Sequence, residues 1–339
     1  MSFISSMLDS FENYMTDRGF EKGITALIVG MLAIIIGQYV NAFFTVLSRD
    51  LIANPSFLKG MNMALRGFLL SYLPVTILFI MGLYLWFAEP NGYARFMGLL
   101  ILIFYVVPLL APWFPFSDAK YAIDHFKINP TICYLILFLV GGYIFEIFYN
   151  EINDRIHISS QGGVISRILV SVDSFLSGAG LEKGTIAFII GMFFIYFTSI
   201  VHEMGHVLVA SYLGCKAAIV KDLGFIAASA INCPATTSNL HWILICYAGP
   251  MFAFLLGLLL WFAEPNGYAR LGGLIAFLYS CLPNIAPWIP QSDAMVAVTK
   301  YHMPLSASFL IFILIGGYIM YNVYQEIHDQ IGGANAKKH

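Results

Sequence analysis

Charged residues are scarce in this chain of 339 residues: Asp, Glu, Lys and Arg together make up 11% of it, whereas hydrophobic residues make up 59%. Globular proteins have roughly 25% charged and about 45–50% apolar residues, so this chain has too few polar groups to cover a surface that faces water. The composition excludes both an ordinary soluble protein and a disordered one. It predicts a polytopic membrane protein.

Two kinds of partner are excluded by the same scarcity of charge. The chain has only 17 Lys and Arg and a net charge of −2. It therefore has no basic surface for nucleic acid and no polybasic segment for lipid headgroups.

Cysteine is also scarce. The five cysteines are odd in number and include no CxxC pair or other closely spaced set. We therefore expect neither a disulfide framework nor a cysteine zinc site. A cleavable signal pattern is lacking too, because the apolar residues from Phe3 to Met15 follow helical spacing and predict a helix that lies along the membrane interface.

Long apolar runs, in contrast, are abundant. A hydrocarbon core about 30 Å thick needs roughly 20 apolar residues per helix. Eight segments meet this requirement, at 24–47, 67–88, 96–114, 130–149, 185–213, 240–262, 271–289 and 305–324. The predicted fold class is an all-α polytopic membrane protein with about eight transmembrane helices. Lys and Arg divide almost evenly between the two sides, so the positive-inside rule predicts no orientation.

An internal duplication organises these spans. The letters LWFAEPNGYAR occupy both 85–95 and 260–270, an offset of 175 residues, and upstream the offset is 161, from Gly30-Met31 to Gly191-Met192. We predict two membrane repeats, at 1–160 and 161–339, each with an interfacial helix and four spans. Because four is even, the repeats are parallel. The second repeat contains about 14 additional residues, within 214–239.

One predicted span contains ionisable residues, which are costly inside a membrane and indicate function there. Residues 202–206 read HExxH, with His202, Glu203 and His206. The i, i+4 spacing places both imidazoles on one helix face, where they can bind one zinc ion. Glu203 borders that face and is placed to act as a general base. The alternative is that all three are buried polar groups satisfied by neighbouring helices, without a metal.

Comparison of the two repeats favours a site over a structural role. At the offset of 161, the residues opposite His202, Glu203 and His206 are Asn41, Ala42 and Thr45, although the flanking residues match. A motif needed for folding would be expected in both repeats. We therefore predict that the second repeat is catalytic and that the first is a degenerate, non-catalytic copy.

A catalytic zinc usually has three protein ligands. Asp293 is the predicted third ligand, because it follows a stretch with three prolines that interrupts the seventh predicted span. Against this, the first repeat keeps Asp118 at the equivalent position, so the aspartate is alternatively a helix cap. Glu264 and Glu326 are poorer candidates because they lie at the opposite ends of their helices. Asn284 is opposite Leu109, so this polar residue occurs only in the repeat that has the histidines.

Three motifs in this order resemble the site-2 protease family of intramembrane zinc metalloproteases. They are HExxH at 202–206, Ala248-Gly249-Pro250, and Asn284-x-x-Pro287 leading to Asp293. The resemblance covers roughly residues 185–300. It implies a catalytic core of three helices. It also implies a re-entrant or strand-like loop at 216–235, directly after the HExxH helix.

The resemblance also implies a role for each motif residue. His202, His206 and Asp293 would bind Zn²⁺, and Glu203 would be the general base. Asn284 would bind substrate or shape the site. The zinc side of the membrane would be cytoplasmic.

These expectations describe a zinc-dependent intramembrane endopeptidase that hydrolyses a peptide bond in or near a transmembrane segment. Its partners would be a membrane-protein substrate and the lipid bilayer, with no nucleic acid, and the sequence leaves open whether the chain forms a homo-oligomer. We expect an integral membrane protein that crosses the membrane several times, and the cell membrane is the favoured location. The alternatives are a transporter built from parallel repeats and a non-catalytic protein that binds membrane peptides.

Overall fold

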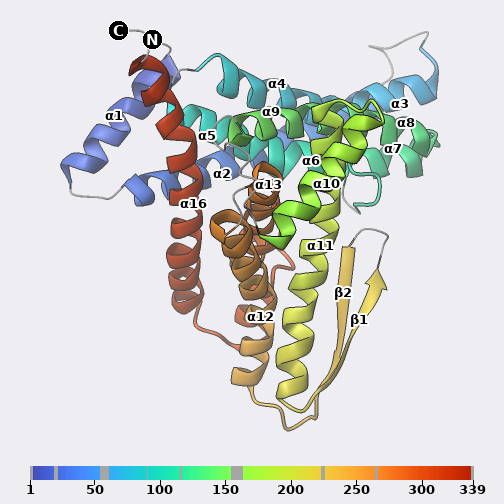
Figure 1. Ribbon diagram of the computed structural model, residues 1–339. Helices are drawn as coiled ribbons and strands as arrows, with labels where there is room; N and C mark the ends of the chain where they lie inside the picture. Colours follow the sequence, from blue (N-terminus) through green and yellow to red (C-terminus); the bar gives the residue numbers. More distant parts are fainter. Residues whose placement is uncertain are drawn as a thin grey trace. The chain divides into compact units, whose positions relative to one another are not determined.

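The computed structural model is built from helices, with one β-hairpin in the second half of the chain (Figure 1). It describes residues 3–18, 22–53, 61–89, 91–114, 117–153, 163–222, 226–263 and 266–336. The first half contains α1 (Phe3–Asp17), α2 (Lys22–Ala53), α3 (Met63–Ser71), α4 (Leu73–Phe87), α5 (Gly92–Ile101), the π-helical η2 (Leu102–Val106), α6 (Val107–Leu110), α7 (Asp118–Phe126), α8 (Pro130–Ile136), the π-helical η3 (Leu137–Gly141) and α9 (Gly142–Asn153). The second half contains α10 (Val164–Gly178), α11 (Lys183–Tyr212), β1 (Lys216–Asp222), β2 (Ile226–Asn232), α12 (Asn239–Leu258), the π-helical η4 (Leu259–Ala263), α13 (Gly267–Ile275), the π-helical η5 (Ala276–Cys281), α14 (Leu282–Ile285), α15 (Asp293–Tyr301) and α16 (Leu305–Ala336).

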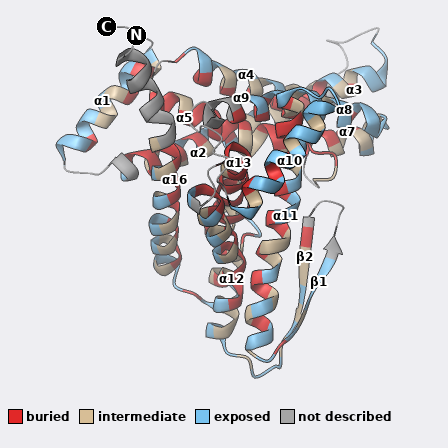
Figure 2. Cartoon of the chain, viewed as in Figure 1, coloured by how far each residue is buried: buried red, intermediate tan, exposed pale blue. Residues whose placement is uncertain are grey.

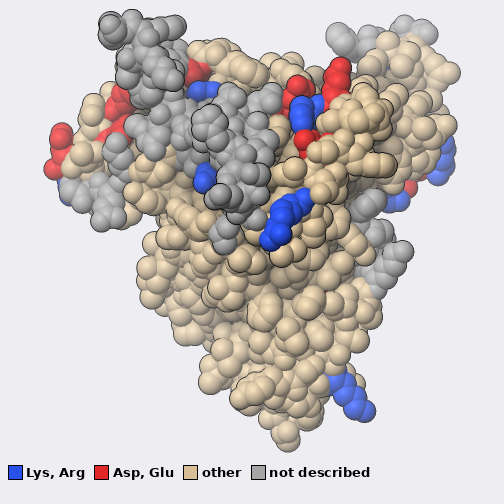
Figure 3. Space-filling model, in the orientation of Figure 1, with Lys and Arg blue, Asp and Glu red and all other residues tan. Residues whose placement is uncertain are grey.

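Seven helices in the described part of the chain are long and apolar enough to cross a membrane, which makes this a multi-pass membrane protein. They are Ile24–Leu51, Met63–Phe87, Gly92–Leu110, Pro130–Ile147, Lys183–Tyr212, Asn239–Phe262 and Leu305–Gln325. Each overlaps a predicted span. The visible face over α12 and the lower part of α11 has almost no charged side chains, as a lipid-facing surface requires (Figure 3).

The segment 271–289, predicted as a further span, differs from the other seven. It is helical from Gly267 to Ile285, through α13, η5 and α14, but it is not among the seven candidate spans. Arg270, Ser280 and Asn284 lower its hydropathy. Nearly all side chains of α13 and η5 are buried, and a helix surrounded by protein can be less apolar than one that faces lipid.

Matched residues of the two repeats build the same helix starts. The side chains of Asn91 and Asn266 each accept two backbone N–H groups in the first turn of α5 and α13. Ser117 and Ser292 each accept one at the start of α7 and α15. Such caps satisfy donors that the first turn of a helix leaves without partners. The repeated sequence thus forms repeated local structure.

The chain packs as two compact units that do not coincide with the sequence repeats. Unit 1 comprises Met1–Gly141 and Met320–His339, and unit 2 comprises Gly142–Ile319. The fourth helix of each repeat therefore begins in one unit and ends in the other. The predicted repeat boundary at 160/161 lies outside the described residues.

Helix α11 is the centre of unit 2. It packs most extensively on α12, and at Gly205 the two backbones lie so close that an added Cβ would be 2.5 Å from the carbonyl oxygen of Ala248. Helix α11 carries buried positions along its length (Figure 2). Its buried residues include His202 and His206. The two histidines of this apolar helix are thus turned toward protein.

The predicted strand-like loop after the HExxH helix is an antiparallel hairpin. Strands β1 and β2 pair from Lys216 with Asn232 to Asp222 with Ile226, and they lie along α11 (Figure 1). Gly214, with φ at +82°, lets the chain leave α11 and turn back into β1. The additional residues of the second repeat form this hairpin.

The expectation of no disulfide is wrong. Cys215 and Cys233 form a disulfide that joins the start of β1 to the residue after β2. The sequence places them 18 residues apart, and the hairpin brings them together. Cys133, Cys246 and Cys281 are free and buried, so the odd total is one pair and three separate thiols.

Candidate metal centre

The two histidines of the HExxH motif face the same space beside α11. Both are 6% exposed. Their Nε2 atoms are 3.1 Å apart, and their ring centroids are 4.8 Å apart. One helical turn separates the two residues, so this convergence follows from the i, i+4 spacing. Glu203, which is half-buried, belongs to the same group, and its ligand atom lies within 4.8 Å of those of the histidines.

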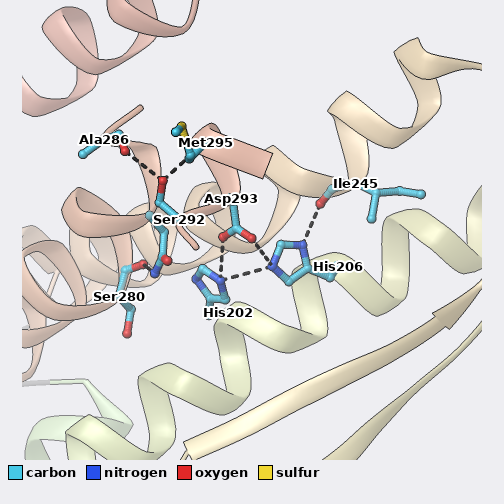
Figure 4. A network of polar contacts seen from close by, with 9 residues as sticks. His202, His206, Ile245, Ser280, Ala286, Ser292, Asp293 and Met295 are labelled. Carbon is cyan, nitrogen blue, oxygen red and sulfur yellow. Dashed lines mark hydrogen bonds and ion pairs between the residues drawn. The ribbon is translucent and has the colours of Figure 1, made fainter. Parts of the chain in front are cut away.

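Asp293 reaches the histidines from a separate element (Figure 4). Helix α14 ends at Ile285, and the chain then runs through Pro287, Pro290 and Gln291, whose φ is +65°, before α15 begins. This break places the Asp293 Oδ2 atom 3.0 Å from the His202 Nε2 atom. The Oδ1 atom is 3.5 Å from the His206 Nε2 atom. The structure therefore brings together the three side chains predicted as metal ligands.

Helix α15 is capped by Ser292 and not by Asp293, the alternative role considered for the aspartate. The hydroxyl of Ser292 accepts the backbone N–H of Met295 and donates to the carbonyl of Ala286. Ser117 accepts the equivalent N–H, of Lys120, in the first repeat. Because the serine satisfies this donor, the carboxylate of Asp293 is free to face the imidazoles.

The spacing of these three groups fits a tetrahedral metal. Two ligand atoms at about 2.0–2.1 Å from a tetrahedral zinc ion are roughly 3.3–3.4 Å apart. The distances among the Asp293 oxygens and the two Nε2 atoms are 3.0, 3.1 and 3.5 Å. Two nitrogens and a carboxylate are also ligands that zinc accepts. The residues present thus fit a metal ion held by His202, His206 and Asp293.

The orientation of His206 supports this fit. Its Nδ1 atom is 2.6 Å from the carbonyl oxygen of Ile245 on α12, so Nδ1–H donates and Nε2 presents its lone pair. Metal-binding histidines commonly have such an outer partner. The Nδ1 atom of His202 is buried without a hydrogen-bond partner among the described residues. The ring of His202 is therefore held mainly from its Nε2 side.

Gly249 on α12 leaves the space in which the imidazoles converge. A Cβ at this position would lie 2.3 Å from Nε2 of His206 and 2.8 Å from Nε2 of His202. At the offset of 175 the first repeat has Pro74 here, so the glycine occurs only where the histidines do. Gly249 has no role predicted from the sequence beyond its place in the Ala248-Gly249-Pro250 motif. The difference between repeats was the signal that identifies it.

Asn284, the predicted substrate-binding residue, is fixed within its own helix. Its Nδ2 atom donates to the carbonyl of Ser280 at 2.9 Å. The hydroxyl of Ser280 donates in turn to Thr198 on α11. Among the described contacts, none joins Asn284 to the histidines or to Asp293. Its predicted role in binding substrate stays a prediction.

Ser199 lies next to the site and was not predicted from the sequence. Its hydroxyl accepts the backbone N–H of Ala227 at 3.0 Å and so attaches β2 to α11 one turn before Glu203. A serine in an apolar helix four residues before Glu203 was the available signal, because i and i+4 share a helix face. The contact holds the hairpin beside the histidines.

The two equivalent aspartates have opposite electrostatic environments. Burial alone would raise the pKa of the Asp293 carboxyl, but its interactions with His202 and His206 outweigh burial and hold that pKa below its ordinary value. Asp118 has no histidines, and burial raises its pKa to about 7, despite a hydrogen bond from the Val75 backbone and the charge of Arg49. Asp293 is thus an anion that its surroundings stabilise.

In comparisons with known proteins, no family model, no curated protein and no solved structure matches this chain.

Proposed function

We propose that this protein is a zinc-dependent intramembrane endopeptidase. One observation carries the proposal: the Asp293 carboxylate lies 3.0 and 3.5 Å from the Nε2 atoms of His202 and His206. Glu203 belongs to one group with the same two histidines. A helix that crosses a membrane has no structural need for this group, because buried ionisable residues cost free energy there. An HExxH glutamate next to a three-ligand site is the arrangement of a metalloprotease. The resemblance to the site-2 protease family supports the same activity.

Each side chain has a distinct role in the proposed reaction. His202, His206 and Asp293 would hold the metal, and the carbonyl of Ile245 keeps His206 in the tautomer that binds through Nε2. A bound zinc ion supplies Lewis acidity and lowers the pKa of water toward 7. Glu203 accepts a proton from the attacking water and returns it to the leaving amine, as a general base and then a general acid.

The hairpin supports a way to present substrate. A helical peptide bond has its carbonyl engaged in a hydrogen bond, so the substrate must be extended at the cleaved bond. The N–H of Ala227 points to Ser199 on α11, away from β1. Because directions alternate along a strand, the N–H groups of Ser229 and Ile231 point the same way. Ser199 already binds the N–H of Ala227, so an extended substrate segment would add as a further strand along the part of this edge that Ser229 and Ile231 present.

The finer membrane topology is part of the same proposal. We assign Gly267–Ile285 as an eighth span that is surrounded by protein, which gives each repeat four spans and a parallel orientation. The cell membrane is the proposed location.

A cleavage experiment tests the activity. Purified full-length protein is reconstituted in liposomes with zinc and a set of single-span peptides, and mass spectrometry identifies new termini. We expect cuts within or beside the apolar segment for the wild-type protein and for Asp118→Asn, a matched change in the first repeat. Glu203→Gln should abolish them. Equal cleavage by Glu203→Gln and wild type would rule out the proposed mechanism.

A further inference from the structure

A helix of the first repeat is packed into the unit that contains the metal centre. Phe145 on α9 is 5% exposed and lies against Gly191 of α11, where an added Cβ would be 2.3 Å from the phenyl ring. The same ring packs edge-on against Phe188, with centroids 5.9 Å apart. Gly191 and the histidines belong to one helix, so α9 packs directly on the element that positions them.

The equivalent contact occurs in unit 1 with the repeats interchanged. The counterpart of Phe145 at the offset of 175 is Met320, and the counterpart of Gly191 at the offset of 161 is Gly30. Met320 is fully buried, and its Sδ and Cε atoms would lie 3.1 Å from a Cβ added at Gly30. The fourth helix of each repeat thus packs on the first span of the other repeat.

A second pair of contacts shows the same exchange. In unit 2, Tyr149 on α9 stacks on Tyr268 of α13 with ring centroids 4.3 Å apart. In unit 1, their counterparts Tyr324 and Tyr93 stack at 4.2 Å. Helix α10 is attached to the unit 2 pair, because the hydroxyl of Tyr268 donates to Asp173 at 2.7 Å. Two independent contacts at matched positions exclude a chance arrangement.

We propose that the first repeat is an obligate structural partner of the metal-bearing unit. It completes unit 2 by contributing α9, and the second repeat completes unit 1 by contributing the end of α16. Reciprocal exchange of one element is the arrangement of a domain-swapped homodimer. The surface on α11 and α13 that receives α9 therefore fits the fourth helix of a second copy of the repeat. The duplicated chain supplies that copy within one molecule.

This exchange explains why a degenerate repeat persists without the metal ligands. The first repeat has no counterparts of His202, Glu203 and His206 at the matched positions but has apolar and aromatic residues where the two repeats pack across the exchange. The packing requirement acts on Phe145 and Tyr149, and it does not depend on which metal or substrate the second repeat binds.

Cross-linking in the full-length protein tests the exchange directly. The variant Phe145→Cys with Gly191→Cys is expressed with a specific protease site inserted in the 154–162 segment, then oxidised in membranes and cut. We expect the two fragments to stay joined on a non-reducing gel. The control pair, Gly30→Cys with Gly191→Cys, also has one cysteine in each fragment and should separate, because Gly30 packs against Met320 and Gly191 packs against Phe145. The parent protein without introduced cysteines is the reference.

The possible outcomes are distinct. The proposal is supported if the two fragments stay joined within one chain for the first pair and separate for the control pair. Separation of the first pair, joining in the control pair, or a product that contains two whole chains would each overturn it, the last because α9 would then come from a neighbouring molecule. None of these results depends on zinc or on protease activity, so the proposed function stands or fails separately.

Two substitutions that shorten a side chain measure how the packing of α9 affects the metal centre. Phe145→Ala removes packing from α11, so we expect the purified protein to lose most of its bound zinc and unit 2 to become more sensitive to protease. Phe145→Leu should restore both. Met320→Ala, the matched change in unit 1, should retain zinc. Equal zinc loss in Phe145→Ala and Met320→Ala would show general destabilisation and contradict a specific role for α9.

Discussion

The Oδ2 atom of Asp293 lies 3.0 Å from the Nε2 atom of His202, although the two residues belong to α15 and α11. The break after α14 makes this contact, because a continuous helix would have directed residue 293 away from the histidines. The candidate metal centre therefore depends on an interruption of regular structure as much as on the HExxH motif.

Asp293→Asn is expected to weaken zinc binding strongly while the fold is retained. Loss of an outer-shell partner alone typically costs about 10–100-fold in metal affinity, and removal of a ligand's charge should cost at least as much. Competition with a chelator of known affinity measures the change. Asp118→Asn is the matched control and should bind zinc like the wild type. Wild-type affinity in Asp293→Asn would assign the third ligand to another residue.

Gly249→Ala should abolish metal binding by filling the space between the imidazoles. The added methyl would lie 2.3 Å from Nε2 of His206, closer than van der Waals contact allows. Gly142→Ala is a suitable control, because the nearest atom to its Cβ is 4.0 Å away and alanine favours a helix over glycine. Zinc content and thermal unfolding of the two variants provide the comparison. Full zinc content in Gly249→Ala would show that the histidines converge elsewhere.

Much of the architecture was predictable from the sequence, because long apolar runs predict membrane-spanning helices and repeated letters predict an internal duplication. The π-helical segments and the unit boundaries at 141 and 319 were not. Which copy of a fourth helix packs on which first span depends on long-range packing, and the matched positions of the two repeats are apolar in both. Phe145 and Met320 differ in type but occupy equivalent places, so no local pattern distinguishes exchange from its absence.

The candidate site was predictable where its chemistry is local. The spacing of His202 and His206 determines that they share a helix face, and the difference between repeats singled them out. The contact of Asp293 was expected from the proline-rich break. In contrast, the disulfide and the partner of Ser199 on β2 depend on how the inserted hairpin folds back on α11, which residue spacing does not encode.

Stability should depend on pH through Asp118. Its pKa is about 7 in the folded protein and about 3.9 for an unperturbed aspartate. Because the folded state binds the proton more tightly, this contribution to stability is fully present below about pH 4 and is lost as the pH rises through about 7. Asp118→Asn should therefore stabilise the protein relative to wild type more at pH 8 than at pH 5. Melting temperatures at both pH values measure this, and a pH-independent difference would contradict it.

The Cys215–Cys233 disulfide should stabilise the hairpin locally. Closing a loop of about 15 residues is worth on the order of 3 kcal/mol in the chain-entropy model. We expect Cys215→Ser to increase hydrogen exchange in β1 and β2 while α11 and α12 stay protected. Cys215→Ser with Cys233→Ser should match the single variant, since either change breaks the same bond. Unchanged exchange in the hairpin would show that packing on α11 suffices.

The same disulfide indicates on which side of the membrane the hairpin lies. Disulfides persist mainly in oxidising compartments, whereas the resemblance to the site-2 protease family implies a cytoplasmic zinc side. We expect the pair to resist alkylation in intact cells until a dithiol reductant is added. Alkylation by a membrane-permeant reagent without reductant would show that the thiols are free in the cell.

The most direct test of the account is the zinc content of the purified full-length protein beside Glu203→Gln and His202→Ala. The wild type and Glu203→Gln should each bind about one zinc ion per chain, because Glu203 lies outside the three-ligand set typical of a catalytic zinc. His202→Ala should lose it. Absence of zinc from the wild type, or equal metal content in all three proteins, would contradict the central claim that His202, His206 and Asp293 form a metal centre.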